Sequence, residues 1–212
     1  MKLLERAIAF AALAHNTRTK DKKPQLYDGV SYLNHLSAVA DNVEKFLPTN
    51  YDPKRLEQLK SAAWLHDTIE DTDVSYEELT LIFGKFIADL VFAVTNEGSY
   101  TRAEQLEAVY GKIQANRDAL VIKLADRIAN TEASVKLHFT KPGSKNYMGK
   151  YIEEYPRFKG AMWGWSQYMN ELKPFWEHLD NLTNKPQYAF KYVLKENVTW
   201  DNVGVEVKDA KK

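Results

Sequence analysis

The segment Leu65–Thr72, which reads LHDTIEDT, concentrates one histidine and three carboxylates in a short stretch of chain. His66 and Asp67 are adjacent, and Glu70 and Asp71 follow within about one helical turn. An imidazole nitrogen beside a carboxylate oxygen suits divalent cations such as Mn²⁺, Fe²⁺, Mg²⁺ or Zn²⁺. Taken alone, a His-Asp pair is equally consistent with a helix end whose acids are solvated. A metal site therefore requires further ligands from elsewhere in the chain.

Two distant segments offer such ligands. His35 lies in SYLNHLSAVADNVEKFL, where apolar residues repeat at helical spacing. Asp126 lies in ALVIKLADRIANTEAS, a strongly apolar helical segment in which a carboxylate needs an ionic, hydrogen-bonding or metal partner. Three predicted helices could thus bring His35, the His66-Asp67 pair and Asp126 to one internal point. Because the sequence contains no cysteine, histidine and carboxylate groups must supply the ligands of any such metal site.

This H…HD…D arrangement resembles that of the HD-domain metal phosphohydrolases. LHDTIEDT and IKLADRIAN together are similar to the hydrolase domain of the RelA/SpoT homologues, which remove the 3′-pyrophosphate from (p)ppGpp. The opening AIAFAALAH, the basic loop after it and SYLNHLSAVA are similar to the start of that domain. The resemblance extends from about Ala7 to about Ser134 and, more weakly, over Tyr147 to Tyr155.

The resemblance implies a small alarmone hydrolase that converts (p)ppGpp and water into GDP or GTP and pyrophosphate. It implies one Mn²⁺ ion, with Glu70 and Asp71 orienting and deprotonating the attacking water. Asp67 and Asp126 would neutralise a divalent ion, which suits Mn²⁺ without excluding other divalent metals. One alternative is an HD phosphohydrolase of another nucleotide, such as NADPH at its 2′-phosphate or a 3′-nucleotide. Another is a non-catalytic metal-binding or nucleotide-binding module, although such a module would not need Glu70 and Asp71.

Several cations and aromatic residues are candidates for binding the nucleotide. Arginine and lysine are the usual partners of phosphate oxygens, and the family carries a basic loop where this chain has Arg18 and Lys20. The resemblance also implies that Asn130, one helical turn after Asp126, contacts the nucleotide. The full set of predicted substrate contacts is Arg18, Lys20, Lys123, Arg127, Asn130, Tyr147, Lys150 and Tyr151.

The overall composition indicates an ordinary globular protein of 212 residues, with 44% apolar and 27% charged residues. We expect one hydrolase domain over residues 1–180 and a C-terminal extension of unassigned role over 181–212. Basic and acidic residues number 29 each, which argues against binding to a nucleic-acid polymer or an anionic membrane. The absence of cysteine and of an apolar run of about 20 residues favours a cytoplasmic protein. The expected partner is a small phosphorylated nucleotide, and the oligomeric state is not indicated.

The periodicities predict an all-α HD-domain helical bundle of about eight to ten helices. Irregular segments are expected at 16–31, 68–74 and 136–146. Alternating apolar residues in 188–194 and 203–207 predict a short β hairpin in the C-terminal tail. The predicted helices are 2–15, the His35 segment, 53–67, 75–83, 86–94, 101–114, the Asp126 segment with Asp118 as its cap, 147–155 and 160–172.

Overall fold

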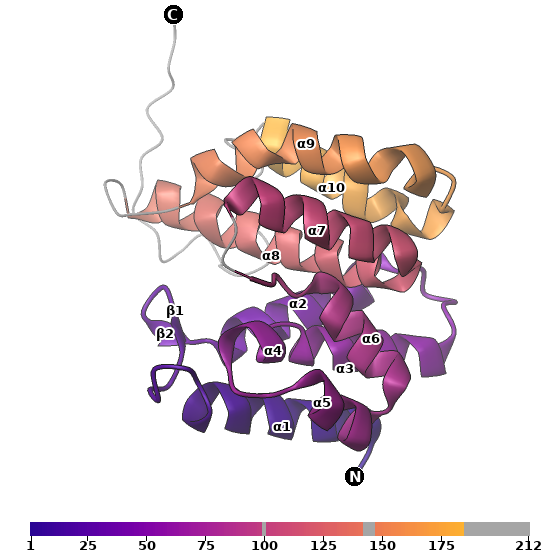
Figure 1. The fold of residues 1–212 in the computed structure, drawn as a ribbon. Coiled ribbons are helices and arrows are strands. Elements are labelled where there is room, and N and C mark those ends of the chain that lie inside the picture. Colours follow the sequence, from indigo (N-terminus) through magenta and orange to yellow (C-terminus); the bar gives the residue numbers. More distant parts are fainter. Residues whose placement is uncertain (99–100, 142–146, 185–212) are drawn as a thin grey trace, which may run out of the picture.

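The computed structural model describes residues 1–98, 101–141 and 147–184, and these residues are predominantly helical (Figure 1). The prediction of an all-α fold is confirmed, while the predicted hairpin of the tail lies outside the described residues. The helices are α1 (Leu3–Thr17), α2 (Leu33–Phe46), α3 (Pro53–Leu65), α4 (Thr68–Asp71), α5 (Tyr76–Phe83), α6 (Lys85–Val94), α7 (Arg102–Ala115), α8 (Arg117–Thr140), α9 (Met148–Ser166) and α10 (Lys173–Asn184), with a 3₁₀ turn at Asn170–Leu172.

Helix α8 lies between two groups of helices. Figure 1 shows α1 to α6 in the lower part of the molecule and α7, α9 and α10 in the upper part. Helix α8 contacts α2, α3 and α6 on one side and α7, α9 and α10 on the other. The side-chain amide of Asn42 in α2 donates to the carbonyl oxygen of Ala125 at 3.3 Å, which ties α2 to α8 beside Asp126. The central position of α8 therefore carries Asp126 into the interior.

Several helix boundaries follow from capping residues that the sequence displays. Asp52 accepts a hydrogen bond from the Arg55 amide at the start of α3, which has proline in its first turn. Ser75 and Thr101 cap α5 and α7 in the same way. Gly84 has a φ of +87°, which favours glycine, and it separates α5 from α6.

Four local predictions are wrong. The segment predicted as irregular at 68–74 contains α4, a single turn in which the Asp71 amide donates to the Asp67 carbonyl. Helix α8 continues through 136–140, which was expected to be loop. Asn116, not Asp118, is the N-terminal cap of α8, because Asp118 lies in its first turn and pairs with Arg55. The two helices expected at 147–155 and 160–172 are replaced by α9, which runs through Pro156, and the 3₁₀ turn.

A short hairpin lies inside the predicted loop at 16–31. Strands β1 (Leu26–Tyr27) and β2 (Val30–Ser31) pair antiparallel around a two-residue turn. Asp28 and Gly29 both have positive φ, +51° and +81°, as a tight hairpin turn requires. The hairpin precedes α2 and brings Tyr27 next to His35.

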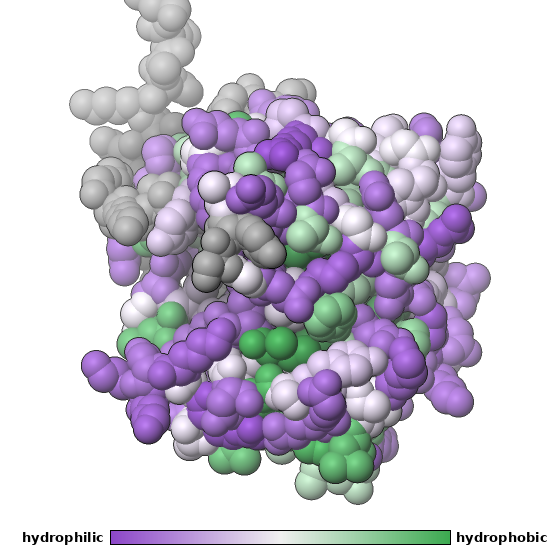
Figure 2. Space-filling view, in the orientation of Figure 1, coloured by the Kyte–Doolittle hydropathy of each residue, from purple (hydrophilic) through white to green (hydrophobic). Residues whose placement is uncertain are grey.

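The exposed face drawn in Figure 2 is mostly hydrophilic, with apolar side chains gathered near α4 and α6 at the centre and near α5 at the bottom. Among the described residues, no helix combines the length and the hydropathy that crossing a bilayer would require.

Candidate functional site

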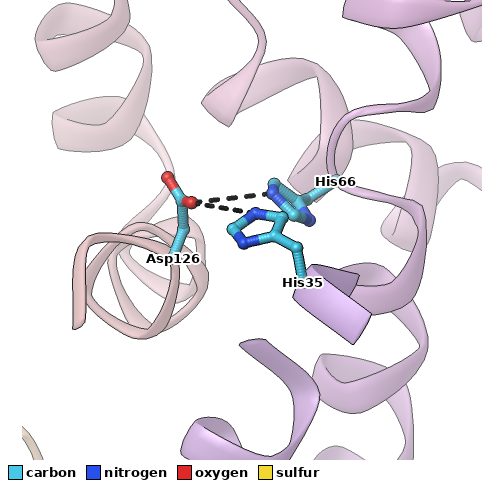
Figure 3. A group of neighbouring side chains, drawn as sticks. All are labelled: His35, His66 and Asp126. Carbon is cyan, nitrogen blue, oxygen red and sulfur yellow. Dashed lines mark ion pairs between the residues drawn. The ribbon is translucent and has the colours of Figure 1, made fainter. Parts of the chain in front are cut away.

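The structure brings His35, His66 and Asp126 together in the interior (Figure 3). They come from α2, from the residue that ends α3, and from α8. One ligand atom from each lies within 4.8 Å of the others, and all three residues are buried. Oδ1 of Asp126 lies 3.4 Å from Nε2 of His35 and 3.8 Å from Nε2 of His66. The predicted convergence of these segments is therefore present in the fold.

The hydrogen bonding of His66 tests whether a cation fits this group. Its Nδ1 lies 2.8 Å from the carbonyl oxygen of Ala63, which can only accept, so Nδ1 carries a hydrogen. Nε2 is buried and lies 2.9 Å from Oδ2 of Asp67, but no described residue meets it in the geometry of a hydrogen bond. Burial alone would lower the pKa of His66, but Asp67 and Asp126 outweigh it and raise that pKa to about 9. A proton thus takes the position that a cation would take, and the donor set of nitrogen and carboxylate oxygen fits a divalent metal ion.

Asp67 lies directly beside this group. Its Oδ2 is 2.9 Å from Nε2 of His66 and 3.8 Å from Nε2 of His35, and it also accepts a hydrogen bond from the Tyr32 hydroxyl. Burial would raise the pKa of Asp67, but the His66 imidazole outweighs it and lowers that pKa. Burial opposes ionisation of Asp126 as well, and Lys123, 3.2 Å away, and His35 hold its pKa below the usual range. Both carboxylates are therefore anionic.

Glu70 and Asp71 line a cavity of about 280 Å³ that His35, Asp67 and Asp126 also line. The Glu70 carboxylate accepts hydrogen bonds from the backbone amide of Asn96 at 2.9 Å and from its side-chain amide at 2.9 and 3.0 Å. The Asp71 carboxylate accepts one from the side chain of Gln25 at 2.7 Å. Burial and the charge of Asp67 raise the pKa of Asp71 to about 6. A carboxylate with a pKa near neutrality is suited to accepting a proton.

Cationic side chains line the rest of this cavity. Arg102, Lys123, Arg127 and Lys150 all contribute to its wall. Glu154 bridges two of them, with Oε1 3.1 Å from Nε of Arg102 and Oε2 3.4 Å from Nη2 of Arg127. Burial and the Arg102 guanidinium lower the pKa of Lys150. A cavity lined by carboxylates, the His35 imidazole and several cations suits a metal ion together with the phosphate groups that bind to it.

The predicted substrate contacts divide into those that line this cavity and those that do not. Lys123, Arg127, Asn130, Lys150 and Tyr151 line it. Lys20 lines an adjoining cavity of about 550 Å³, which Glu70 and Asp71 also border, and its ammonium group donates to the Glu70 carbonyl.

The two remaining predicted contacts, Arg18 and Tyr147, are not among the residues that line the 280 Å³ cavity. Arg18 is bound at 2.6 Å by both Asp73 and Glu78. Tyr147 is 46% exposed, and its ring lies 5.6 Å from Nζ of Lys150.

Sequence reasoning missed five residues around the site. Gln25 and Asn96 bind the two candidate catalytic carboxylates, Tyr32 binds Asp67, and Arg102 joins the cations. Tyr27 stacks on His35 with ring centroids 5.0 Å apart, and its hydroxyl donates to Oδ1 of Asn130 at 2.8 Å. Only Tyr32 carried a usable signal, since it precedes His35 by three residues and could share its helix face.

No protein-family model matches the chain. The guanosine-3′,5′-bis(diphosphate) 3′-pyrophosphohydrolase MESH1 of Danio rerio is 37% identical over 130 residues, which is 60% of this chain and 66% of that protein. MESH1 of Homo sapiens is 34% identical over 130 residues, which is 61% of this chain and 67% of that protein. The chain belongs to this family of pyrophosphohydrolases. The match thus spans just under two thirds of the zebrafish protein, and it spans only 20% of the longer pyrophosphohydrolase of Aquifex aeolicus, at 32% identity.

A solved structure shares the fold of this chain. It is described as a metazoan ortholog of SpoT that hydrolyzes ppGpp and plays a role in starvation responses. The two chains share 22% identity and a TM-score of 0.51, over 92% of this chain and 96% of the other. The predicted family is confirmed by the relatives above, whose matches cover about 60% of the chain.

Proposed function

We propose that this chain hydrolyses (p)ppGpp at its 3′-pyrophosphate, giving GDP or GTP and pyrophosphate. The observation that carries the proposal is the cavity of about 280 Å³, which is lined by His35 and Asp126 of the buried His35–His66–Asp126 group and by the cations of α7, α8 and α9. Family membership supports the choice of this substrate over NADPH or a 3′-nucleotide. The proposed partner is a small phosphorylated nucleotide and the proposed location is the cytoplasm.

His35, His66, Asp67 and Asp126 would hold the metal ion. Mn²⁺ is proposed, because two imidazoles and two carboxylates offer a mixed donor set that balances its charge. A bound divalent ion would polarise the phosphoryl group and lower the pKa of a water molecule. The tautomer of His66 is already set for such a role, because the Ala63 carbonyl holds the hydrogen on Nδ1.

Asp71 accepts a proton from the attacking water in this proposal, and Glu70 orients that water. Asn96 holds Glu70 through both carboxylate oxygens, so its position is fixed while Asp71 changes protonation state. The water oxygen bonds to the phosphorus next to the ribose 3′-oxygen, and the bond from that phosphorus to the 3′-oxygen breaks. The 3′-oxygen takes the proton that Asp71 accepted, so the Asp71 carboxylate is regenerated. Arg102, Lys123, Arg127 and Lys150 bind the phosphates and stabilise the negative charge of the pyrophosphoryl group that is transferred to water.

Amide variants of the two carboxylates test this assignment. Glu70→Gln and Asp71→Asn keep the shape of each side chain but remove its charge. We expect kcat for (p)ppGpp to fall by about 10²–10⁴, the usual range for lost general acid–base assistance, while metal content and substrate Kd stay close to wild type. Glu77→Gln, in an exposed position of α5, is the matched control. Near-normal turnover in both variants would contradict the mechanism, and a loss of metal would instead identify a ligand.

The substrate itself is tested by comparing (p)ppGpp, NADPH and a 3′-nucleotide on the same preparation. The proposal expects the highest kcat/KM for (p)ppGpp and release of pyrophosphate in a 1:1 ratio with GDP or GTP. Faster release of orthophosphate from NADPH or the 3′-nucleotide would favour the corresponding alternative. Tight binding without turnover of any of them would favour a non-catalytic nucleotide-binding module.

A further inference from the structure

A chain of side-chain hydrogen bonds connects Asp71 to a buried histidine outside the metal group. Gln25, in the segment before β1, donates from Nε2 to Oδ2 of Asp71 at 2.7 Å. Its other amide atom, Oε1, lies 2.6 Å from Nδ1 of His15, near the end of α1. His15 is 1% exposed, and none of the roles assigned above uses it.

The chemistry of Asp71 fixes the orientation of this whole chain. An ionised carboxylate only accepts hydrogen bonds, so the NH₂ group of Gln25 must face it. The amide oxygen of Gln25 then faces His15, and this oxygen in turn requires a hydrogen on Nδ1 of that ring. A rotated amide would place oxygen against carboxylate and NH₂ against N–H. Only one arrangement of the three groups therefore satisfies both contacts.

Gln25 is also fixed through its backbone. Its amide nitrogen donates to the His15 carbonyl at 2.9 Å, and its own carbonyl accepts from the Tyr32 amide at 3.1 Å. The His15 ring packs on the Tyr32 ring with centroids 5.0 Å apart, and the Tyr32 hydroxyl binds Asp67. Because both its backbone and its side chain are engaged, Gln25 has little freedom to move relative to Asp71.

We propose that Gln25, held in turn by His15, is a positioning residue that fixes the Asp71 carboxylate for proton transfer. The proposal rests on the proposed function, in which Asp71 accepts the proton of the attacking water. With Oδ2 bound to Gln25, Oδ1 is the oxygen that receives the proton. Proton transfer depends steeply on geometry, and a displacement of about 1 Å can cost roughly 10²-fold in rate.

A double-mutant cycle between Gln25 and Asp71 tests the proposal. Gln25→Met has a similar length and cannot donate to Asp71. We expect it to lower kcat for (p)ppGpp by about 10- to 100-fold, with KM and bound metal unchanged. In the Asp71→Asn background, Gln25→Met should cause no further loss of kcat, because its effect passes through Asp71. An unchanged kcat in the single variant, or an equal loss in both backgrounds, would overturn the proposal.

Gln25→Glu keeps an acceptor for His15 but cannot donate to Asp71 when ionised, so it is the second variant if Gln25→Met fails to fold. It should show the same fall in kcat, and a wild-type kcat would overturn the proposal.

A pair of His15 variants provides the rescue test. The side-chain amide of asparagine can donate from about the position of Nδ1, whereas leucine cannot donate. His15→Asn should retain most of the wild-type kcat, and His15→Leu should lose about as much as Gln25→Met, both measured on folded protein of known melting temperature. Equal kcat values for the two would overturn the role of His15.

The Asp71→Asn variant distinguishes a failure of the catalytic role of Asp71 from a failure of the positioning role of Gln25. If it turns over at the wild-type rate, the catalytic role of Asp71 fails and the positioning role fails with it. If Asp71→Asn is impaired and Gln25→Met is not, only the positioning role is overturned.

Discussion

The side-chain amide of Asn130 donates to Oδ1 of Asp126, the same oxygen that faces the two imidazoles of the metal group. The other atom of that amide, Oδ1, accepts the Tyr27 hydroxyl. Asn130, proposed as a nucleotide contact, therefore also orients the Asp126 carboxylate, a proposed metal ligand.

Replacing Asn130 with alanine should weaken metal binding. Residues that orient a ligand typically contribute about 10- to 100-fold to metal affinity, and we expect a loss in this range for Asn130→Ala, measured by competition with a fluorescent chelator. Tyr27→Phe removes one hydroxyl, keeps the ring stacked on His35, and should cause a smaller loss. Unchanged metal affinity in Asn130→Ala would exclude a role for Asn130 in metal binding and leave only its proposed contact with the nucleotide.

Asp126→Asn should abolish stoichiometric metal binding. The amide keeps the volume of the side chain but removes one anionic ligand. Because the group is buried, the loss of that charge strongly weakens its attraction for a cation. Elemental analysis of protein purified without chelator should show about one ion per chain in the wild type and far less in the variant. Asp41→Asn, at an exposed position of α2, is the control.

Chelation provides an independent check of the metal site. It should lower the melting temperature of the wild type more than that of Asp126→Asn, because only the folded site holds the ion. An equal shift in both proteins would contradict this ligand set.

Arg102→Gln should raise KM for (p)ppGpp by roughly 10- to 100-fold, the cost of one or two charge-assisted hydrogen bonds. The matched variant is Arg18→Gln, which removes an arginine that Asp73 and Glu78 already bind. We expect it to leave KM nearly unchanged. A rise in KM for Arg18→Gln as large as that for Arg102→Gln would favour direct phosphate binding by the basic loop. Lys20→Gln would then show whether Lys20 also binds phosphate.

Glu154 should make the stability of the protein depend on pH. Burial alone would raise its pKa, but Arg102 and Arg127 hold it below the usual value. A carboxylate with a lowered pKa in the folded state stabilises the fold above its unfolded pKa of about 4.5, and this contribution is lost as pH falls through the folded value. Glu154→Gln should therefore lower the free energy of unfolding at pH 7 by about 1–3 kcal/mol.

Denaturant titrations of wild type and Glu154→Gln at pH 7 and near pH 3.5 measure this difference. The gap between the two proteins should narrow at the lower pH. A gap that stays constant would mean that the amide maintains the contacts with Arg102 and Arg127.

The sequence was most informative where one residue type determines local structure. Asp52, Ser75 and Thr101 begin helices as capping residues, and apolar periodicity identifies the helices that carry His35 and Asp126. These features, with the LHDTIEDT segment, were sufficient to predict an all-α domain with its metal group in the interior. Helix caps and apolar periodicity depend on residues only a few positions apart, so they can be identified in the sequence.

The parts that escaped prediction depend on contacts between distant segments. Nothing in the neighbouring sequence distinguishes Gln25 and Asn96 from other polar residues. Their hydrogen bonds to Asp71 and Glu70 form only in the folded chain. Pro156 normally ends a helix, but α9 continues through it, with Tyr155 and Phe158 on either side buried in the core. The ion pairs of Arg18 with Asp73 and Glu78 could not be predicted, because these acids follow more than fifty residues later.

The basic loop is joined to the segment that carries Glu70 and Asp71. The Lys20 amide donates to the Asp71 carbonyl at 3.4 Å, the Asp73 amide donates to the Arg18 carbonyl at 3.0 Å, and the ammonium group of Lys20 binds the Glu70 carbonyl. Any opening of this loop would move the two proposed catalytic carboxylates away from the metal-binding residues. The route by which a nucleotide enters and pyrophosphate leaves is therefore expected on the opposite side of the cavity, past Arg102 at the start of α7 and Lys150 in α9.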